Sequence, residues 1–302
     1  MFALPRTTPE EELLWREALW AELQAHPSWP LLTPELLREI GLYGGAAGIW
    51  LDKSKTSQIN QSGIAVSVLN TGKHYDDDVD EDGIIYHYPT TKRHPSFDAS
   101  EIESVKQAGI LQIPIFVILK KGKHREVRRA WVADFDDVNR LFLIEFGVKQ
   151  PEFVQIEIDK PFEAKSRRTL TIDQIIRVER NPRFKFEVIK RHRGRCAVTG
   201  LSVVEMLDGA HVVPVAQGGS DDPRNGLLLS ASHHRAFDKH LWSINPKTLE
   251  IVTSPKGPTL KAMKFERDSV KHLVETQSLP HSEALEIRYK MFEKANKAAK
   301  LS

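Results

Sequence analysis

The sequence predicts an α+β protein with a β-rich N-terminal part and a smaller strand–loop–strand–helix unit nearer the C-terminus. Five segments between residues 47 and 150 are rich in β-branched and aromatic residues, which is typical of strands: 63–69, 83–89, 113–120, 125–135 and 140–147. One helix interrupts them, with Ile102, Val105 and Ala108 on one face and Ser96 or Asp98 as its cap. We expect a compact β-barrel or a curved sheet with one or two helices.

Two helices are expected before these strands. Thr8 and Glu11 have the spacing of a capping box, and the apolar residues that follow have helical spacing, so residues 9–25 should form a helix. A second, shorter helix is expected from Pro34 to Gly41, because proline suits a first helical turn and glycine suits a helix end.

The chain of 302 residues is long enough for two domains. We expect a first domain over 1–150, a basic connector over 151–182 and a second domain over 183–302. The charged fraction is 28%, and no apolar run approaches the ~20 residues of a membrane span, so no membrane partner is expected. The N-terminus lacks the apolar core of a signal peptide, which favours a cytoplasmic protein.

The chain has a single cysteine, Cys196. An internal disulfide is therefore impossible, and a zinc ribbon with four cysteines is excluded. We expect Cys196 to be a small buried residue.

Positive charge gathers before the second domain, although the formal net charge is only +2. Eleven lysines and arginines lie between Lys165 and Arg195, against three acidic residues. This basic stripe is either a surface for the phosphates of a nucleic acid or a solvated helix and linker. Its candidate DNA-binding residues are Arg183, Lys185, Lys190, Arg191, Arg193 and Arg195.

Three polar residues anchor the second domain: His211, Asn225 and His234. The segment AHVVPV around His211 is apolar and β-branched, which predicts a strand, and GLLLS after Asn225 predicts a second one. The stretch GGSDDPRNG between them is dense in turn formers. Ser232 is the expected cap of a helix that carries His234 and, one turn later, Asp238.

These residues resemble the HNH, or ββα-metal, nucleases. The resemblance is closest to the branch with an Ala-His-hydrophobic-x-Pro first strand and a His-x-x-Phe-Asp helix, near which the McrA-type modification-dependent restriction nucleases lie. It covers about residues 183–250, including the helix PRFKFEVIKRHRGRC that precedes the motif.

The resemblance implies a role for each anchor. His211 matches the general base that takes a proton from water, a task that suits imidazole at neutral pH. His234 matches a ligand of a divalent metal ion, Mg²⁺ or Mn²⁺ with Co²⁺ or Ni²⁺ as alternatives. Asn225 matches the residue that ties the loop so that His211 faces the phosphate.

One position departs from the family pattern. Many HNH enzymes have an Asp or His ligand immediately before the general base, where this chain has Ala210. The ion therefore needs another ligand, and Asp238 or Asp208 is the candidate. His233 is expected to be only a neighbour of the site, and His240 is expected at the surface.

The first domain contains an acidic and aromatic loop that is more loosely similar to that of SRA-type domains in the PUA-like superfamily. Those domains flip a modified base into a pocket, and the residues of such a pocket here would be Tyr75, Asp76, Asp78, Tyr86 and Tyr88. The alternative is a solvated acidic hairpin whose tyrosines belong to the core.

Together these patterns predict a metal-dependent endonuclease that cuts double-stranded DNA and restricts methylated or hydroxymethylated foreign DNA. A homodimer is expected, because cleavage of both strands needs two active sites. Two alternatives remain: an HNH nuclease of a mobile element that cuts specific or arbitrary plain sequence, and a catalytically degenerate DNA-binding regulator.

Overall fold

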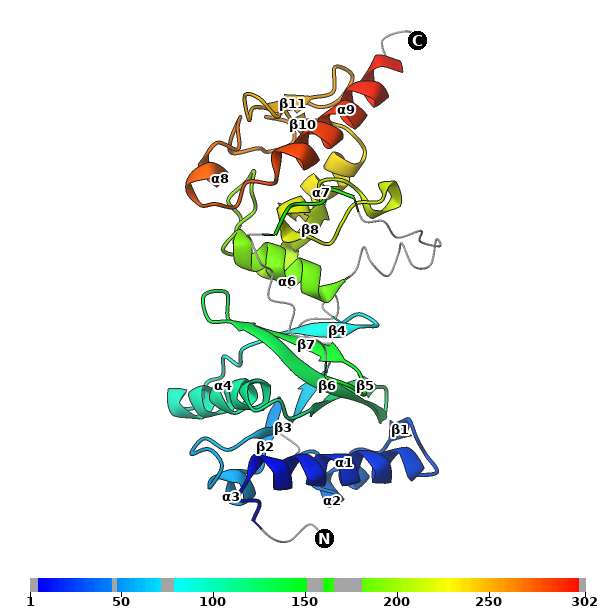
Figure 1. The fold of residues 1–302 in the computed structure, drawn as a ribbon, viewed down its shortest axis with the longest axis vertical. Coiled ribbons are helices and arrows are strands. Elements are labelled where there is room, and N and C mark those ends of the chain that lie inside the picture. Colours follow the sequence, from blue (N-terminus) through cyan, green and yellow to red (C-terminus); the bar gives the residue numbers. More distant parts are fainter. Residues whose placement is uncertain (1–4, 45–47, 72–78, 151–159, 166–180, 299–302) are drawn as a thin grey trace. The chain divides into compact units, whose positions relative to one another are not determined.

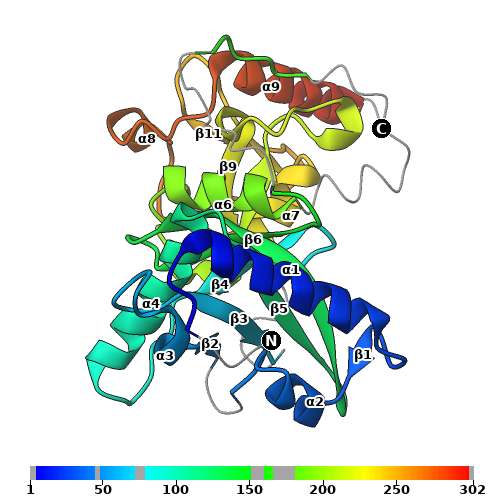
Figure 2. The ribbon, with the colours of Figure 1, turned by 60° about the horizontal axis from the view of Figure 1, so that its bottom comes forward.

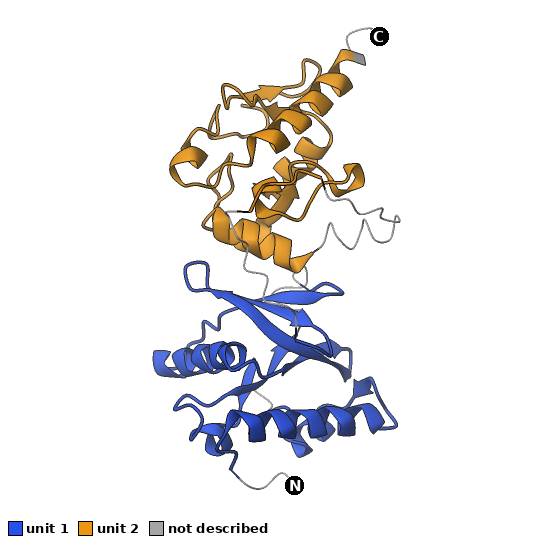
Figure 3. Ribbon diagram, in the orientation of Figure 1, with its two compact units in different colours: residues 1–154 blue, residues 155–302 orange. Residues whose placement is uncertain are grey.

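The computed structural model describes residues 5–44, 48–71, 79–150, 160–165 and 181–298. The chain divides into two compact units, 1–154 and 155–302 (Figure 3). The first unit contains a mixed sheet with helices, and the second contains short strands among helices (Figure 1). The predicted α+β class is confirmed.

The first unit opens with the two expected helices. Helix α1 (Pro9–Ala25) begins with a capping box in which the Thr8 hydroxyl accepts from the backbone N–H of Glu11 and the Glu11 carboxylate accepts from that of Thr8. Helix α2 (Pro34–Glu39) is capped by Thr33. A single turn of helix, α3 (Lys53–Thr56), follows later.

One sheet of seven strands organises this unit, with the order β2-β3-β5-β6-β7-β4 and with β1 paired to β6. All five predicted strands are present. Strands β3 and β5 are parallel, whereas the other pairs are antiparallel. The strands are β1 (Leu31–Leu32), β2 (Ile49–Leu51), β3 (Ala65–Asn70), β4 (Gly83–His87), β5 (Ile115–Lys121), β6 (His124–Asp136) and β7 (Leu141–Phe146).

Helices cover both faces of this sheet, as Figures 1 and 2 show. Strand β5 shows the arrangement best, because its side chains alternate between two cores. Ile115 and Val117 pack in one core with residues of α4 (Pro95–Ile110). Phe116 and Ile118 pack in the other with residues of α1 and α2. A strand buried on both faces explains why this segment is continuously apolar rather than alternating.

The predicted cap of α4 is wrong. Neither Ser96 nor Asp98 caps the helix; instead the ring of His94 accepts from the backbone N–H of Ser96. Asp98 lies within the first turn and accepts from the backbone and side chain of Thr91. The helix therefore starts earlier than either predicted capping residue indicates, at Pro95.

The second unit is built around a hairpin of β8 (Leu207–His211) and β9 (Gly226–Ser230). Helix α6 (Pro182–Arg191) packs across the hairpin so closely that a Cβ on Gly226 would lie 2.2 Å from Cγ2 of Val188. The remaining elements are α7 (Ala231–Asp238), β10 (Trp242–Ile244), β11 (Ile251–Thr253), α8 (His272–Glu275) and α9 (Ser282–Ala298).

Two boundaries in this unit differ from the expectation. The first strand ends at His211 rather than continuing through VVPV, because the Asn225 side chain bonds the backbone of Val213 in place of a neighbouring strand. Helix α7 begins at Ala231 with Ser230 as its N-cap residue, two residues before Ser232. Among the helices that the structure describes, none is long and apolar enough to cross a membrane.

Candidate active site

His211 occupies the last position of β8 and is buried against helix α6. Its ring stacks on Phe184 at a centroid distance of 3.7 Å and an interplanar angle of 7°. Its Nε2 lies 3.1 Å from Oδ1 of Asp221. The ring is thus fixed by an aromatic wall on one side and by a carboxylate at one edge.

Asp221 determines which ring nitrogen can act as a base. An ionised carboxylate can only accept a hydrogen bond, so Nε2 of His211 carries the proton and donates it to Asp221. The lone pair of the neutral ring then lies on Nδ1. Sequence reasoning treated Asp221 only as a turn former, although it is an acidic residue in the loop directly after the base strand.

Asn225 fastens the loop that follows His211. Its Oδ1 accepts from the backbone N–H of Val213 at 2.9 Å, and its Nδ2 donates to the carbonyls of Val213 and Ser220 at 3.1 and 2.9 Å. The side chain is fully buried. All of these bonds are to backbone, which supports a role in holding the loop rather than in contacting substrate.

His234 lies between two carboxylates. Its Nδ1 is 3.1 Å from Oδ2 of Asp208 on β8, and its Nε2 is 3.2 Å from Oδ2 of Asp238, one turn further along α7. Burial lowers the pKa of His234, but the hydrogen bonds and charges of the two carboxylates outweigh it and raise that pKa to about 9. The imidazole is therefore protonated at neutral pH in the absence of an ion.

A pocket of about 350 Å³ brings the base and the second histidine together. Its wall includes His211, His234 and Asp238, whereas Asp208 does not line it. His240, expected at the surface, is half-buried and also lines this pocket. His233 is buried on the other side of α7, where its ring meets Phe265 edge-on.

The pocket side of His234 fits a divalent ion. Asp208 and Asp238 bond opposite nitrogens of the ring, so the three groups do not converge, and the described part of the chain holds no cluster of three metal-binding side chains. An ion in the pocket would take Nε2 of His234 and the Asp238 carboxylate, leaving Asp208 to accept from Nδ1. Two protein ligands suit Mg²⁺ or Mn²⁺, which keep several water ligands. Ala210 is buried and supplies no ligand.

Metal binding should depend on pH because the ion must displace the proton of His234. At pH values below the His234 pKa of about 9, the affinity for Mn²⁺ is expected to rise roughly tenfold for each unit of pH. About one proton should be released for each ion bound. Calorimetric titration from pH 6.5 to 8.5, in buffers of different ionisation enthalpy, measures both quantities. An affinity that does not change with pH would remove His234 from the ligand set.

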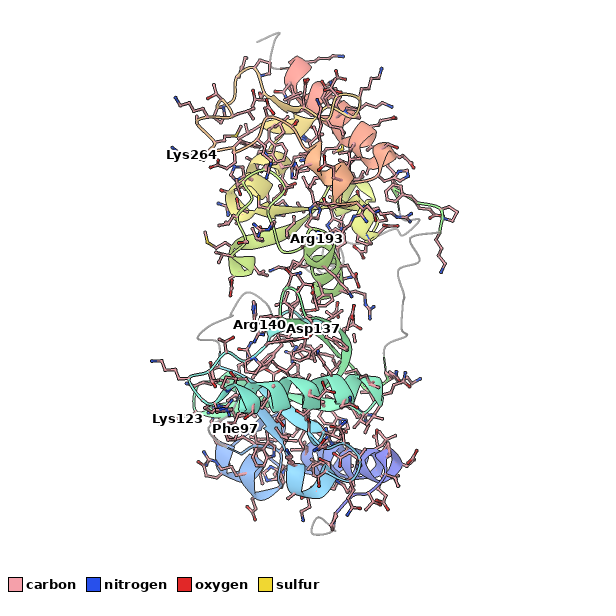
Figure 4. The ribbon with its side chains drawn as sticks, turned by 90° about the vertical axis from the view of Figure 1, so that its left-hand side faces the viewer. Phe97, Lys123, Asp137, Arg140, Arg193 and Lys264 are labelled. Carbon is pink, nitrogen blue, oxygen red and sulfur yellow. The ribbon has the colours of Figure 1, made fainter. Side chains whose placement is uncertain are left out.

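The candidate DNA-binding residues differ in what they contact. Lys190, Arg193 and Arg195 are exposed at and beyond the end of α6, where Figure 4 labels Arg193. Arg183 and Lys185 are half-buried. Arg191 is also half-buried, and its guanidinium donates to the backbone carbonyl of Leu279 at 3.0 Å. Most of the basic stripe before α6, residues 166–180, lies outside the described residues.

The candidate base pocket is placed only in part. Tyr75, Asp76 and Asp78 lie outside the described residues. Tyr88 is a correction: it is 6% exposed, packs on Phe142 in the core and donates to Asp137, so its ring face is not available to a base. Asp137 lies in the turn after β6 with Arg140 (Figure 4). Tyr86 on β4 is half-buried beside the same core.

Cys196 is buried, as expected, and its sulfur accepts from the backbone N–H of Ser230 at 3.4 Å. This bond ties the start of the motif to the N-terminus of α7. The cysteine therefore has a packing role in the hairpin.

Comparison with known proteins identifies the class of this site. Residues 196–245 match the family model of the HNH endonucleases. Residues 196–245 therefore form an HNH endonuclease domain, and this family hydrolyses phosphodiester bonds. No curated protein sequence matches the chain.

The solved structures that are similar to the chain include two restriction endonucleases. The modification-dependent restriction endonuclease TagI is 20% identical, with a TM-score of 0.28, and the match covers 86% of this chain and 95% of that one. The type IV phosphorothioation-dependent restriction endonuclease ScoMcrA is 14% identical, with a TM-score of 0.26, and the match covers 92% of this chain and 64% of that one.

Proposed function

We propose that the protein is a metal-dependent endonuclease that hydrolyses phosphodiester bonds of double-stranded DNA and restricts methylated or hydroxymethylated foreign DNA. The observation that carries the nuclease part is the single pocket lined by His211, His234 and Asp238. The proposed base and the proposed pair of metal ligands thus line one cavity, inside a domain that matches the HNH family.

The contacts of His211 give the proposed general base a defined direction. Nδ1 of His211 takes a proton from the attacking water, since Nε2 is already committed to Asp221. The negative charge of Asp221 then stabilises the imidazolium that forms. An ion held by His234 and Asp238 would supply positive charge for the phosphate and for the departing 3′ oxygen.

The first unit is the proposed reader of modified DNA, and the finer SRA/PUA-like assignment belongs to this proposal. Its sheet is covered on both faces and has its own two cores, which suits a unit that carries out a separate task. The acidic and aromatic segment up to Tyr86 would hold a flipped base. Flipping costs a few kcal/mol, so contacts to the base and its added group must compensate.

The proposed division of labour is a reader over 1–150, a basic connector over 151–182 and a nuclease over 183–302. We also propose that two copies act together. One pocket with one base serves one strand, so a double-strand break needs a second copy of the chain.

Matched plasmids with and without methylated or hydroxymethylated cytosine test this function. With Mg²⁺, Mn²⁺, Co²⁺ or Ni²⁺ present, modified plasmid is expected to be cut about 10–200-fold faster than plain plasmid, the range that one added methyl-sized group confers in a pocket. EDTA should stop the reaction. The His211→Ala protein, purified in parallel, controls for a contaminating nuclease.

The same experiment separates the alternative functions. Equal cutting of both plasmids would favour a nuclease that reads plain sequence and would refute the reader. Metal-independent DNA binding without cleavage of any plasmid would favour a DNA-binding regulator and would refute the nuclease.

A further inference from the structure

Helix α9 contributes a buried arginine to the nuclease pocket from outside the matched segment 196–245. Arg288 is 1% exposed, yet it is among the residues that line the pocket with His211, His234 and Asp238. No motif in the sequence marks this residue, because it lies 50 residues beyond Asp238 in an ordinary helical pattern.

The guanidinium of Arg288 is only partly paired. Its Nη2 donates to the carbonyl of Phe237 at the end of α7, and the group lies 3.8 Å from the centre of the Phe237 ring. The nearest carboxylate is that of Asp238, with Nη2 and Oδ1 3.7 Å apart. Nε and Nη1 are buried and have no hydrogen-bond partner within the described part of the chain.

This arrangement is costly for a residue with only a packing role. A buried cation and its donors are stable only when they are paired, and an apolar side chain of similar volume would avoid the cost. Asp238 offsets little of the free-energy cost of burying the guanidinium, because this carboxylate is 48% exposed and already bonds His234. The missing partner is therefore an anion, and the guanidinium lies on the wall of a pocket built for a phosphodiester.

We propose that Arg288 is a phosphate-binding residue of this nuclease, with Nε and Nη1 donating to the oxygens of a DNA phosphate in the pocket. The proposal rests on the proposed function. Both atoms are shielded before DNA binds, so the phosphate reaches them only after side chains of the pocket shift. The bond then forms where water does not compete, and a planar guanidinium suits a phosphate better than an ammonium does.

Three variants test the proposal. Arg288→Met removes the charge and keeps the volume, Arg288→Lys keeps the charge without the planar fork, and Lys290→Met removes an exposed charge from the same helix as a matched control. Each is made in the active chain for cleavage, and in the His211→Ala chain for binding of a modified duplex at several salt concentrations. Tm and Mn²⁺ affinity are measured for all of them.

Arg288→Met is expected to keep the Tm of the parent or raise it, and to keep its Mn²⁺ affinity. Cleavage should fall by about 10²–10³-fold, as for loss of one donor to a transition-state oxygen. The slope of log K against log salt should become shallower by about 0.9, the value for one lost phosphate contact. Arg288→Lys should keep the slope and lose about tenfold in cleavage, whereas Lys290→Met should match the parent in cleavage.

Other outcomes overturn the proposal. An unchanged slope with reduced Mn²⁺ affinity would mean that Arg288 positions Asp238, and unchanged slope and cleavage would mean that it only packs. If Arg288→Met does not fold, Arg288→Lys decides, because cleavage at the parent rate would refute the phosphate contact. An inactive parent chain would refute the proposed function instead, while the salt slope would still report on Arg288.

Discussion

Replacing His211 by alanine is expected to lower the rate of DNA cleavage by about 10²–10⁴-fold, the usual contribution of one general base. The ring is held by Phe184 and Asp221, and with Nε2 bonded to Asp221 it keeps a lone pair on Nδ1. DNA binding should persist, because the substitution removes no cation. Single-turnover cleavage and duplex binding, measured side by side, give the two quantities.

Two further variants sharpen this test. Asp221→Asn keeps the size of the side chain but loses the charge that stabilises the imidazolium, so we expect a smaller loss of cleavage than for His211→Ala. His124→Ala removes an exposed histidine at the start of β6 and should leave cleavage unchanged. If His211→Ala retained more than half of the parent rate, His211 could not be the base.

Replacing His234 by alanine is expected to weaken Mn²⁺ binding by about 10–100-fold or more and to abolish cleavage at ordinary metal concentrations. The reason is that His234 and Asp238 both line the pocket, with Nε2 of His234 3.2 Å from Oδ2 of Asp238. Calorimetric titration of Mn²⁺ into both proteins measures the change. Equal affinities would exclude His234 as a ligand.

The two carboxylates beside His234 can be distinguished in the same titration. Asp238→Asn removes a proposed ligand and should weaken Mn²⁺ binding nearly as much as His234→Ala does. Asp208→Asn removes only the acceptor for Nδ1, so its effect should be smaller. The reverse order would make Asp208 the ligand and would place the ion on the other side of the ring.

Local sequence patterns predicted the elements well wherever the neighbouring residues determine them. The capping box at Thr8 and the apolar run of β5 depend on nearby side chains or on continuous burial, and both were read correctly. His94 as a cap and the early end of β8 depend on a ring acceptor and on a distant amide. Histidine is not among the usual capping residues, and Asn225 lies 12 residues from Val213.

The candidate site likewise combines features that nearby residues determine with features that depend on distant parts of the chain. The spacing of His211, Asn225 and His234 is a property of one continuous segment and could be recognised in the sequence. The contacts of Asp221, Phe184 and Arg288 are made by folding, because each approaches the anchors from another element. For Tyr88 the sequence pattern was misleading. A tyrosine near acidic residues has the same local sequence whether its ring faces a ligand or the core, and here it is buried in the core.

The stacking of Phe184 on His211 limits how this nuclease could be transplanted into another protein. A graft of the matched segment 196–245 would bring the three anchors but would leave behind α6. The side chains of α6 pack against the His211 ring and fill the space beside Gly226. The graft would also omit α9 and the cation beside Asp238. A graft that keeps these contacts therefore has to extend at least from Asn181 to the end of α9.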